Sequence, residues 1–247
     1  MVLTDILWYM EFPEKIIVTD QEIDLSRLTR EQKDYYIGLA RKISDIYRSS
    51  KQKRIVVSLS GPSGSGKSVI AELLKTIFDS SDKDIIFYPL DLDAFHFSNA
   101  ELEQKGLRGV KGRYDTYNVE LLEDKLQRFL NGENVTFPIY SRGAHEPIEN
   151  GFTVSNDQAI LFLVGLWIQN DSNEWKEIRD QIRYTFSIFG PVDHMRQNTI
   201  QRHIRGGRNE KDAQQFFENS DAVNTQEILS NSVKADEEIQ YFEDIGP

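Results

Sequence analysis

Eight consecutive residues have the types and spacing that hold nucleotide phosphates. They are Gly61-Pro62-Ser63-Gly64-Ser65-Gly66-Lys67-Ser68, which reads G-x-x-x-x-G-K-S. The glycines let the backbone curl so that successive N–H groups point inward at phosphate oxygens. The lysine ammonium can reach the β- and γ-phosphates, and the last serine hydroxyl can bind Mg²⁺. The motif therefore predicts a nucleotide site formed by Gly61, Ser63, Gly64, Ser65, Gly66, Lys67, Ser68 and the following Val69.

The segments on either side of this turn predict the strand and the helix that the motif needs. Residues 55–59 are a short β-branched run, as expected of a buried parallel strand. After the turn, apolar residues recur at helical spacing at Ile70, Leu73, Leu74 and Ile77. The positive end of that helix would add to the anion site. The alternative, a chance glycine–serine loop before a helix, does not predict these flanks.

Two carboxylates follow the next expected strand, residues 84–90. Asp91 and Asp93 would then lie at the carboxyl end of a strand beside the phosphate turn, where open α/β sheets bind ligands. A carboxylate there can accept the proton of an attacking hydroxyl or hold a metal ion. The alternative is a helix cap or a solvated loop end, and the sequence favours the chemical role more strongly for Asp93.

Basic residues gather in two later segments. Residues 107–118 carry Arg108, Lys111 and Arg113 among glycines and tyrosines, which suits a phosphorylated or polyhydroxylated substrate and suits a solvated surface almost as well. Arginines also cluster around residues 202–208, where they could pair with phosphate oxygens and supply positive charge in a transition state. A helix C-terminus favoured by the helix dipole would explain one of these arginines rather than three.

The remaining pattern alternates strands with helices, which predicts a three-layer α/β/α fold with a mainly parallel sheet. We expect helices at 28–48, 119–130, 174–183, 193–204 and 212–218. Further strands are expected at 135–140, 159–164, 184–189 and 240–242, with the very apolar 159–164 central and 240–242 at an edge. Residues 3–12 and 15–23 predict a hairpin in an N-terminal extension, residues 1–28, placed before a nucleotide domain at 29–247.

Composition narrows the classes of protein. The chain has 247 residues, 29 basic and 40 acidic, so its net charge of −11 argues against a nucleic-acid binder. It has no cysteine, which excludes disulfides and thiolate metal sites. Its longest apolar run is about half of a membrane span, and residues 1–10 lack the basic start of a signal peptide. We expect a cytoplasmic protein without membrane or nucleic-acid partners. The sequence leaves open whether the chain forms a homodimer.

Several ordered segments make the chain resemble the phosphoribulokinase/uridine kinase family of P-loop kinases, which includes type I pantothenate kinases. They are GPSGSGKS, DAFH at 93–96, KGRYDTYN at 111–118, PIYSRGAHEP at 138–147 and RHIRGGRN at 202–209, with ENSDAVNT at 218–225 matching loosely. The chain is most similar to the bacterial branch of fructose-transport-related and pantothenate-kinase-like proteins. The resemblance extends from Ile55 to about Asp236.

This resemblance implies a kinase that uses ATP and Mg²⁺ to phosphorylate a hydroxyl of a sugar, a nucleoside or a pantothenate-like metabolite. It implies that Lys67 and Ser68 hold the phosphates and Mg²⁺, and that Asp93 is the general base. Arg205 and Arg208 would be catalytic residues of a mobile lid, about 196–220, that closes over the transferring phosphate. The expected acceptor residues are Asp93, His96, Tyr114, Tyr117, Arg142 and His145.

Two positions depart from the family pattern. Relatives carry V-E-G at the end of the central strand, with a glutamate that helps to position metal or substrate, whereas this chain has Leu163-Val164-Gly165. Asp91 also follows a strand end and could replace that carboxylate as a metal ligand. Asn118 stands where relatives have aspartate. These departures keep a second hypothesis open, a nucleotide-binding regulatory protein or degenerate kinase with little transfer activity.

Overall fold

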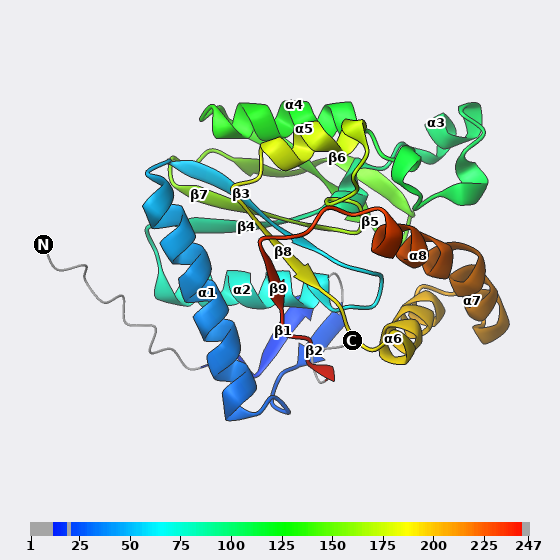
Figure 1. Ribbon diagram of the computed structural model, residues 1–247, viewed down its shortest axis with the longest axis horizontal. Helices are drawn as coiled ribbons and strands as arrows, with labels where there is room; N and C mark the ends of the chain where they lie inside the picture. The colour runs from blue at the N-terminus through cyan, green and yellow to red at the C-terminus, as the bar shows by residue number, and fades with distance from the viewer. Residues whose placement is uncertain (1–11, 19–20, 244–247) are drawn as a thin grey trace, which may run out of the picture.

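Strands and helices alternate along most of the chain in the computed structural model, which describes residues 12–18 and 21–243 (Figure 1). The strands are β1 (Lys15–Val18), β2 (Gln21–Asp24), β3 (Arg54–Ser60), β4 (Ile86–Asp91), β5 (Val135–Ser141), β6 (Glu146–Val154), β7 (Ala159–Gly165), β8 (Tyr184–Ile188) and β9 (Glu237–Ile239). The α-helices are α1 (Arg30–Ser50), α2 (Lys67–Ser81), α3 (Asn99–Gln104), α4 (Val119–Leu130), α5 (Asn173–Asp180), α6 (Val192–Arg205), α7 (Glu210–Phe216) and α8 (Ala222–Ser230). Short helical turns are η1 (Leu92–Phe95), η2 (Arg108–Val110), η3 (Tyr114–Thr116) and the π-helical η4 (Phe217–Asp221).

A parallel sheet forms the middle layer. Within the described residues its five strands follow the order β4-β7-β3-β8-β9, and every neighbouring pair is parallel. The predicted α/β class is therefore confirmed. The phosphate-turn strand β3 is the central one, and the apolar β7, which was predicted to be central, lies directly beside it. The strand predicted at residues 240–242 is wrong, because those residues are not in a strand; the edge strand on this side of the sheet is β9, which ends just before them.

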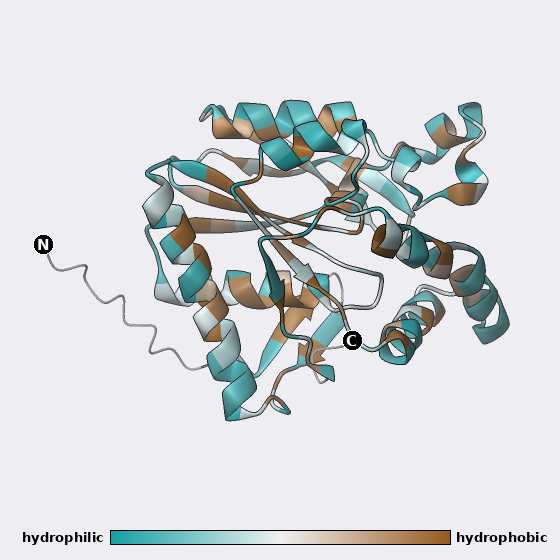
Figure 2. Cartoon of the chain, in the orientation of Figure 1, coloured by the Kyte–Doolittle hydropathy of each residue, from teal (hydrophilic) through white to brown (hydrophobic). Residues whose placement is uncertain are grey.

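Each face of the sheet has its own core, because neighbouring residues of a strand point to opposite faces. Ile55, Val57 and Leu59 of β3 pack with α1 and α2, while Val56 packs with α4 and α5. Every residue of β3 and of β7 is buried, which explains the apolar sequence of β7 and of residues 55–57 in β3. Figure 1 shows the two helix pairs on opposite sides of the sheet, and Figure 2 shows the apolar strands between them.

Local capping signals fix several helix ends. Helix α1 begins after Thr29, whose side chain and that of Gln32 form the reciprocal capping box that the sequence predicted. Helix α4 begins and ends at the predicted residues, and the Asn118 side chain caps it by accepting from the Leu121 N–H at 3.0 Å. Asparagine and aspartate cap helices about equally well, so this departure from the family pattern preserves the local structure.

The structure corrects three predictions about elements. Residues 15–23 were predicted as one strand, but they hold parts of both β1 and β2, which pair as a hairpin. Their expected partner, residues 3–12, lies almost wholly outside the described residues. Strand β6 was not predicted; all but one of its residues are partly or fully exposed, and it pairs with β5 across an irregularity at Pro138. The helix expected at 212–218 continues through η4 into α8.

No helix within residues 12–18 and 21–243 combines the length and the apolar character needed to span a lipid bilayer.

Candidate nucleotide and acceptor site

The phosphate turn leads from the carboxyl end of β3 into the N-terminus of α2, as the motif predicted. Gly64 has φ 78° and Gly66 has φ 86°, values that favour glycine. Gly64 has a second role, because a Cβ there would lie 2.2 Å from the Met195 carbonyl oxygen and 2.6 Å from Thr199 Oγ1 of α6. Helix α6 therefore rests directly on the turn. The Val69 side chain is buried in the core, which leaves only its backbone for a phosphate.

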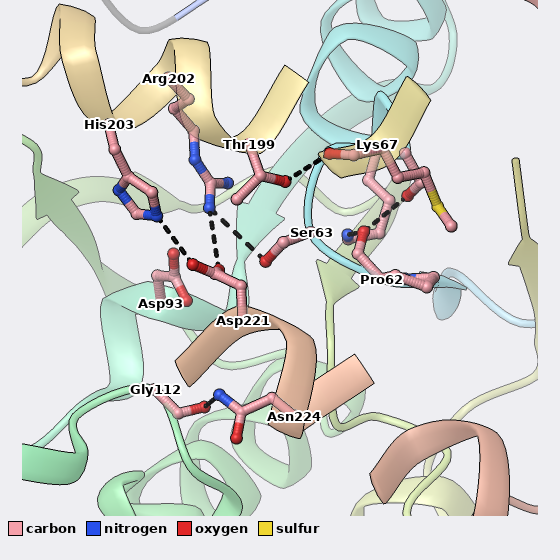
Figure 3. A network of polar contacts seen from close by, with 12 residues as sticks. Pro62, Ser63, Lys67, Asp93, Gly112, Thr199, Arg202, His203, Asp221 and Asn224 are labelled. Atoms are coloured by element: carbon pink, nitrogen blue, oxygen red, sulfur yellow. Dashed lines mark hydrogen bonds and ion pairs between the residues drawn. The ribbon is translucent and has the colours of Figure 1, made fainter. Parts of the chain in front are cut away.

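Lys67 lies inside the turn with its ammonium group held by backbone oxygens. Its Nζ donates to the Gly61 and Pro62 carbonyls, each at 2.8 Å (Figure 3). Desolvation, reinforced by the nearby positive charge of Arg202, lowers the pKa of Lys67 to about 8. Carbonyl dipoles compensate a buried charge less well than an anion does. The turn therefore fits a phosphate group, which would supply the negative charge that Lys67 lacks.

Two side chains of α6 also reach the turn. Asn198 Nδ2 donates to the Gly64 carbonyl at 3.1 Å. Figure 3 shows the second contact, in which Arg202 Nη2 approaches Ser63 Oγ at 3.5 Å. These residues are four apart and share a helix face. Arg202 was not among the predicted site residues. Arg205, one turn further along α6, was a predicted site residue. It is exposed and has no hydrogen bond or ion pair within the described residues.

Asp221 ties α6 to the segments that follow it. Arg202 Nη2 lies 3.6 Å from Asp221 Oδ1, and His203 Nε2 lies 2.8 Å from Asp221 Oδ2. Arg208 Nη1 lies 2.9 Å from His203 Nδ1; since arginine can only donate, Nδ1 accepts and Nε2–H donates to Asp221. The predicted residue Arg208 is thus held between His203 and Phe216, with its guanidinium 4.0 Å from the centre of the Phe216 ring.

On the acceptor side, Arg142 lies between the two predicted carboxylates. Its Nη2 is 3.1 Å from Asp91 Oδ2, and its Nη1 is 3.2 Å from Asp93 Oδ2. Tyr117, which is buried, donates its hydroxyl to Asp93 Oδ1 at 3.2 Å. The structure therefore brings together four residues that the sequence analysis assigned to the site, Asp91, Asp93, Tyr117 and Arg142.

The same contacts separate the pKa values of the two carboxylates. Burial alone would raise the pKa of Asp93, but the Arg142 guanidinium and the other nearby cations lower it to about 2. Burial and the adjacent negative charge of Asp93 instead raise the pKa of Asp91. Asp93 is therefore ionised at neutral pH, with an oxygen available to accept a hydrogen bond.

The other predicted acceptor residues lie at different places around Asp93. His96 Nδ1 is 2.9 Å from the Asp93 backbone carbonyl oxygen; because a carbonyl oxygen only accepts, Nδ1 is the donor. The His96 ring packs on Tyr117 with ring centroids 3.9 Å apart. Tyr114 instead packs edge-on against Trp167. His145 is exposed in the β5–β6 turn and has φ 53°, a left-handed conformation that is uncommon for a residue other than glycine.

The residues present can hold Mg²⁺ together with a nucleotide. Within the described residues there is no cluster of three or more His, Cys, Asp or Glu that would bind a metal alone. Nucleotide-bound Mg²⁺ usually takes only one or two protein ligands, because phosphate oxygens and waters complete its shell. Ser68 at the start of α2 and Asp91 at the end of β4 supply such a set.

Val164 occupies the position of the missing glutamate. It is buried in the core beside α2, and it is the register partner of Asp91 on the adjacent parallel strand. Register partners project from the same face of a sheet, and neighbouring strands are about 4.8 Å apart. Asp91 therefore places a carboxylate about one strand away from the expected position, on the same face.

Comparison with known proteins gives one matching family and several similar chains. Residues 56–189 match the family described as "Phosphoribulokinase / Uridine kinase family". The chain is 26% identical over 230 residues to the "Uncharacterized protein YggC" of Escherichia coli (strain K12), covering 93% of this chain and 96% of that protein. It is 27% identical over 162 residues to the pantothenate kinase of Streptococcus pneumoniae (strain 70585), covering 65% of this chain and only about half, 53%, of that enzyme.

A solved structure from Silicibacter sp. TM1040, described provisionally as a fructose transport system kinase, has a similar fold. Its TM-score is 0.75 at 22% identity, and the match covers 82% of this chain and 98% of that one. This likeness supports the three-layer architecture.

Proposed function

The chain belongs to the phosphoribulokinase/uridine kinase family of P-loop kinases, and we propose that it transfers the γ-phosphate of MgATP to a hydroxyl of a small metabolite. The observation that carries this proposal is the ionised Asp93 carboxylate. Arg142 and Tyr117 hold it near the buried Lys67 ammonium, on which its charge acts. A general base and a phosphate-binding cation within electrostatic reach of each other are what phosphoryl transfer to a hydroxyl needs.

Each residue then has a defined task. The turn N–H groups and Lys67 bind the β- and γ-phosphates, and Arg202 adds positive charge from α6. The acceptor oxygen forms a bond to the γ-phosphorus while the bond to the β–γ bridging oxygen breaks, and the hydroxyl proton passes to Asp93. In a loose transition state this proton moves late, so a carboxylate of low pKa can serve as the base.

Magnesium would neutralise charge on the transferring phosphate, and we assign Ser68 and Asp91 as its protein ligands. In the structure both Asp91 oxygens have partners, Arg142 at 3.1 Å and the Asp93 N–H at 2.9 Å. Metal binding would therefore draw Asp91 away from Arg142 and leave that guanidinium to Asp93. We further propose that residues 196–220 close over the phosphates and exclude water.

A second candidate function is nucleotide-dependent regulation without efficient transfer. Val164 favours it, since this buried valine stands where relatives carry a carboxylate. This alternative predicts MgATP binding without acceptor-dependent turnover.

The deciding experiment measures ADP release from MgATP against a panel of sugars, nucleosides, pantothenate and hydroxy acids, with MgATP binding measured separately. We expect one class of compound to raise turnover above background hydrolysis. Asp93→Asn should retain MgATP binding and lose transfer. Asp82→Asn is a matched control, because Asp82 is also paired with an arginine, Arg48, at 2.7 Å but lies at the opposite end of α2. Unchanged transfer in Asp93→Asn would refute the assigned base.

A further inference from the structure

Residues 218–225 contain buried polar side chains to which the proposed function gives no task. Asp221 is the last residue of the π-helical turn η4, and Asn224 lies in the first turn of α8; both side chains are buried. Buried polar groups normally have hydrogen-bond partners, and π-helical turns are often found at functional sites. The partners of these two side chains therefore indicate what the segment does.

The Asp221 carboxylate contacts two neighbouring residues of α6. Its Oδ2 accepts from His203 Nε2 at 2.8 Å, and its Oδ1 lies 3.6 Å from Arg202 Nη2 (Figure 3). Because Arg208 donates to His203 Nδ1, the proton of the His203 ring is on Nε2 and faces Asp221. One oxygen of the carboxylate is thus fixed by His203, which leaves the other directed at Arg202.

The guanidinium of Arg202 has few other contacts that could hold it. Among the described residues its polar partners are Asp221 and Ser63, and the 3.5 Å contact with Ser63 Oγ is at the limit of a hydrogen bond. Desolvation and the positive charge of Arg142 lower the pKa of Arg202, and Asp221 is the carboxylate that opposes this shift most strongly. Without Asp221 the long arginine side chain would be free to leave the phosphate turn.

Asp221 is anchored to parts of the chain other than α6. Three residues later, Asn224 Nδ2 donates to the Gly112 carbonyl at 3.2 Å, and that carbonyl also accepts from Trp167 Nε1 at 2.8 Å. Further along α8, Ile228 is buried in the same core cluster as Trp167. The position of Asp221 is therefore set by the loop of residues 107–118 and by the core, as well as by its contacts with α6.

Arg202 can bind a phosphate and keep its contact with Asp221. Arginine has five N–H donors, and the contacts of Arg202 with the described residues use Nη2 alone. We propose that Asp221 is a positioning residue for the phosphate site, which holds the Arg202 guanidinium beside the turn where it meets the nucleotide phosphates. This inference rests on the proposed function, in which Arg202 adds positive charge there.

A double-mutant cycle on nucleotide affinity tests this role. Calorimetry with a non-hydrolysable MgATP analogue compares the wild type, Asp221→Asn, Arg202→Gln and the double variant. In Asp221→Asn the amide oxygen can still accept from His203, but the charge that holds Arg202 is lost. Removing a carboxylate near the phosphates also changes the affinity directly. That direct effect is present in both backgrounds, so it cancels in the cycle.

We expect Asp221→Asn to weaken binding by a factor at least about three larger in the wild-type background than in Arg202→Gln, since ordering one long side chain has an effect of this size. A general loosening of η4 would act equally in both backgrounds. An equal effect in both would therefore refute a role through Arg202. A cycle of the opposite sign would also overturn the proposal, because Asp221 would then compete with phosphate for Arg202.

Glu218→Gln is the matched control. Glu218 also belongs to η4 and also pairs with an arginine of α6, Arg196, at 3.1 Å. Arg196, however, has no hydrogen bond to the phosphate turn among the described residues. Glu218→Gln should therefore bind the analogue as the wild type does. A loss of affinity as large as that in Asp221→Asn would refute a specific role for Asp221.

The binding cycle does not depend on phosphoryl transfer, which separates this inference from the kinase proposal. If no acceptor raises ADP release but the cycle shows the expected difference, the kinase proposal fails and the role of Asp221 stands. If an acceptor is turned over but Asp221→Asn acts equally in both backgrounds, the kinase proposal stands and the role of Asp221 fails. A wild type that does not bind the analogue would overturn both.

Discussion

The environment of Lys67 predicts that nucleotide binding weakens as the pH rises through about 8. Desolvation and the charge of Arg202 lower the pKa of Lys67 to about 8 in the nucleotide-free protein, although Asp91 and Asp93 oppose the shift. A bound triphosphate adds negative charge beside Nζ and favours the protonated amine. Because the bound state has the higher pKa, nucleotide binding above about pH 8 takes up a proton and loses affinity with rising pH.

The size of the effect follows from the pKa. About half of the Lys67 side chains are charged at pH 8 and about one in ten at pH 9. The affinity should therefore fall about twofold by pH 8 and about tenfold by pH 9, ~1.4 kcal/mol, relative to pH 7. The neighbouring tyrosines do not titrate in this range, because burial raises the pKa of Tyr140 to about 12 and that of Tyr117 well above its usual value.

Calorimetric titration with a non-hydrolysable MgATP analogue, in two buffers of different ionisation enthalpy, measures both the affinity and the proton uptake. The control is Lys67→Met, which should bind weakly at every pH and take up no proton through this position. An affinity of the wild type that stays constant from about pH 7 to 9, with no uptake of protons, would refute the reasoning about Lys67.

Three further predictions concern residues around the phosphates. Gly64→Ala should lower the free energy of unfolding in urea by about 1–3 kcal/mol and weaken nucleotide binding, because its Cβ meets the α6 backbone at 2.2 Å; normal stability and binding would contradict the packing. Arg202→Gln should reduce nucleotide affinity and kcat more than Arg205→Gln does, since only Arg202 reaches the turn; the reverse order in steady-state kinetics would refute this ranking. Asp91→Asn should raise the Mg²⁺ concentration needed for half-maximal turnover, and adding Val164→Glu should lower it again; no shift in a Mg²⁺ titration would exclude Asp91 as a ligand.

Elements with signals in their own sequence were predicted well. Helix α4 matches its expected bounds because Asn118 caps its start and Asn131-Gly132 ends it. The buried strands β3 and β7 are short apolar runs of the expected kind. Strand β6 has no such signal, because it contains no buried apolar run and only its last residue, Val154, is buried. The split of residues 15–23 into two strands depends on tertiary contacts, in which Ile16 and Ile23 both enter the core beside α2.

The site was predictable where function depends on local spacing. The phosphate turn and the Asp91–Asp93 pair needed only the sequence and the rule that ligands bind at the carboxyl ends of parallel strands. The arginines of α6 did not follow this rule. Arg202 and Arg205 are one turn apart on α6, and only the packing of that helix on Gly64 decides which of the two faces the phosphate turn.

The segment around Asp221 links the two halves of the site. Asp221 holds Arg202 and His203 of α6, and three residues later Asn224 Nδ2 donates to the Gly112 carbonyl at 3.2 Å (Figure 3). The same carbonyl accepts from Trp167 Nε1 at 2.8 Å, which fixes the loop of residues 107–118 to the segment that follows β7. Arg202 thus has a protein anion, Asp221, on one side and the phosphate turn on the other. A phosphate that drew Arg202 toward the turn would weaken its contact with Asp221, and the same segment holds residues 107–118 through the hydrogen bond from Asn224 to Gly112.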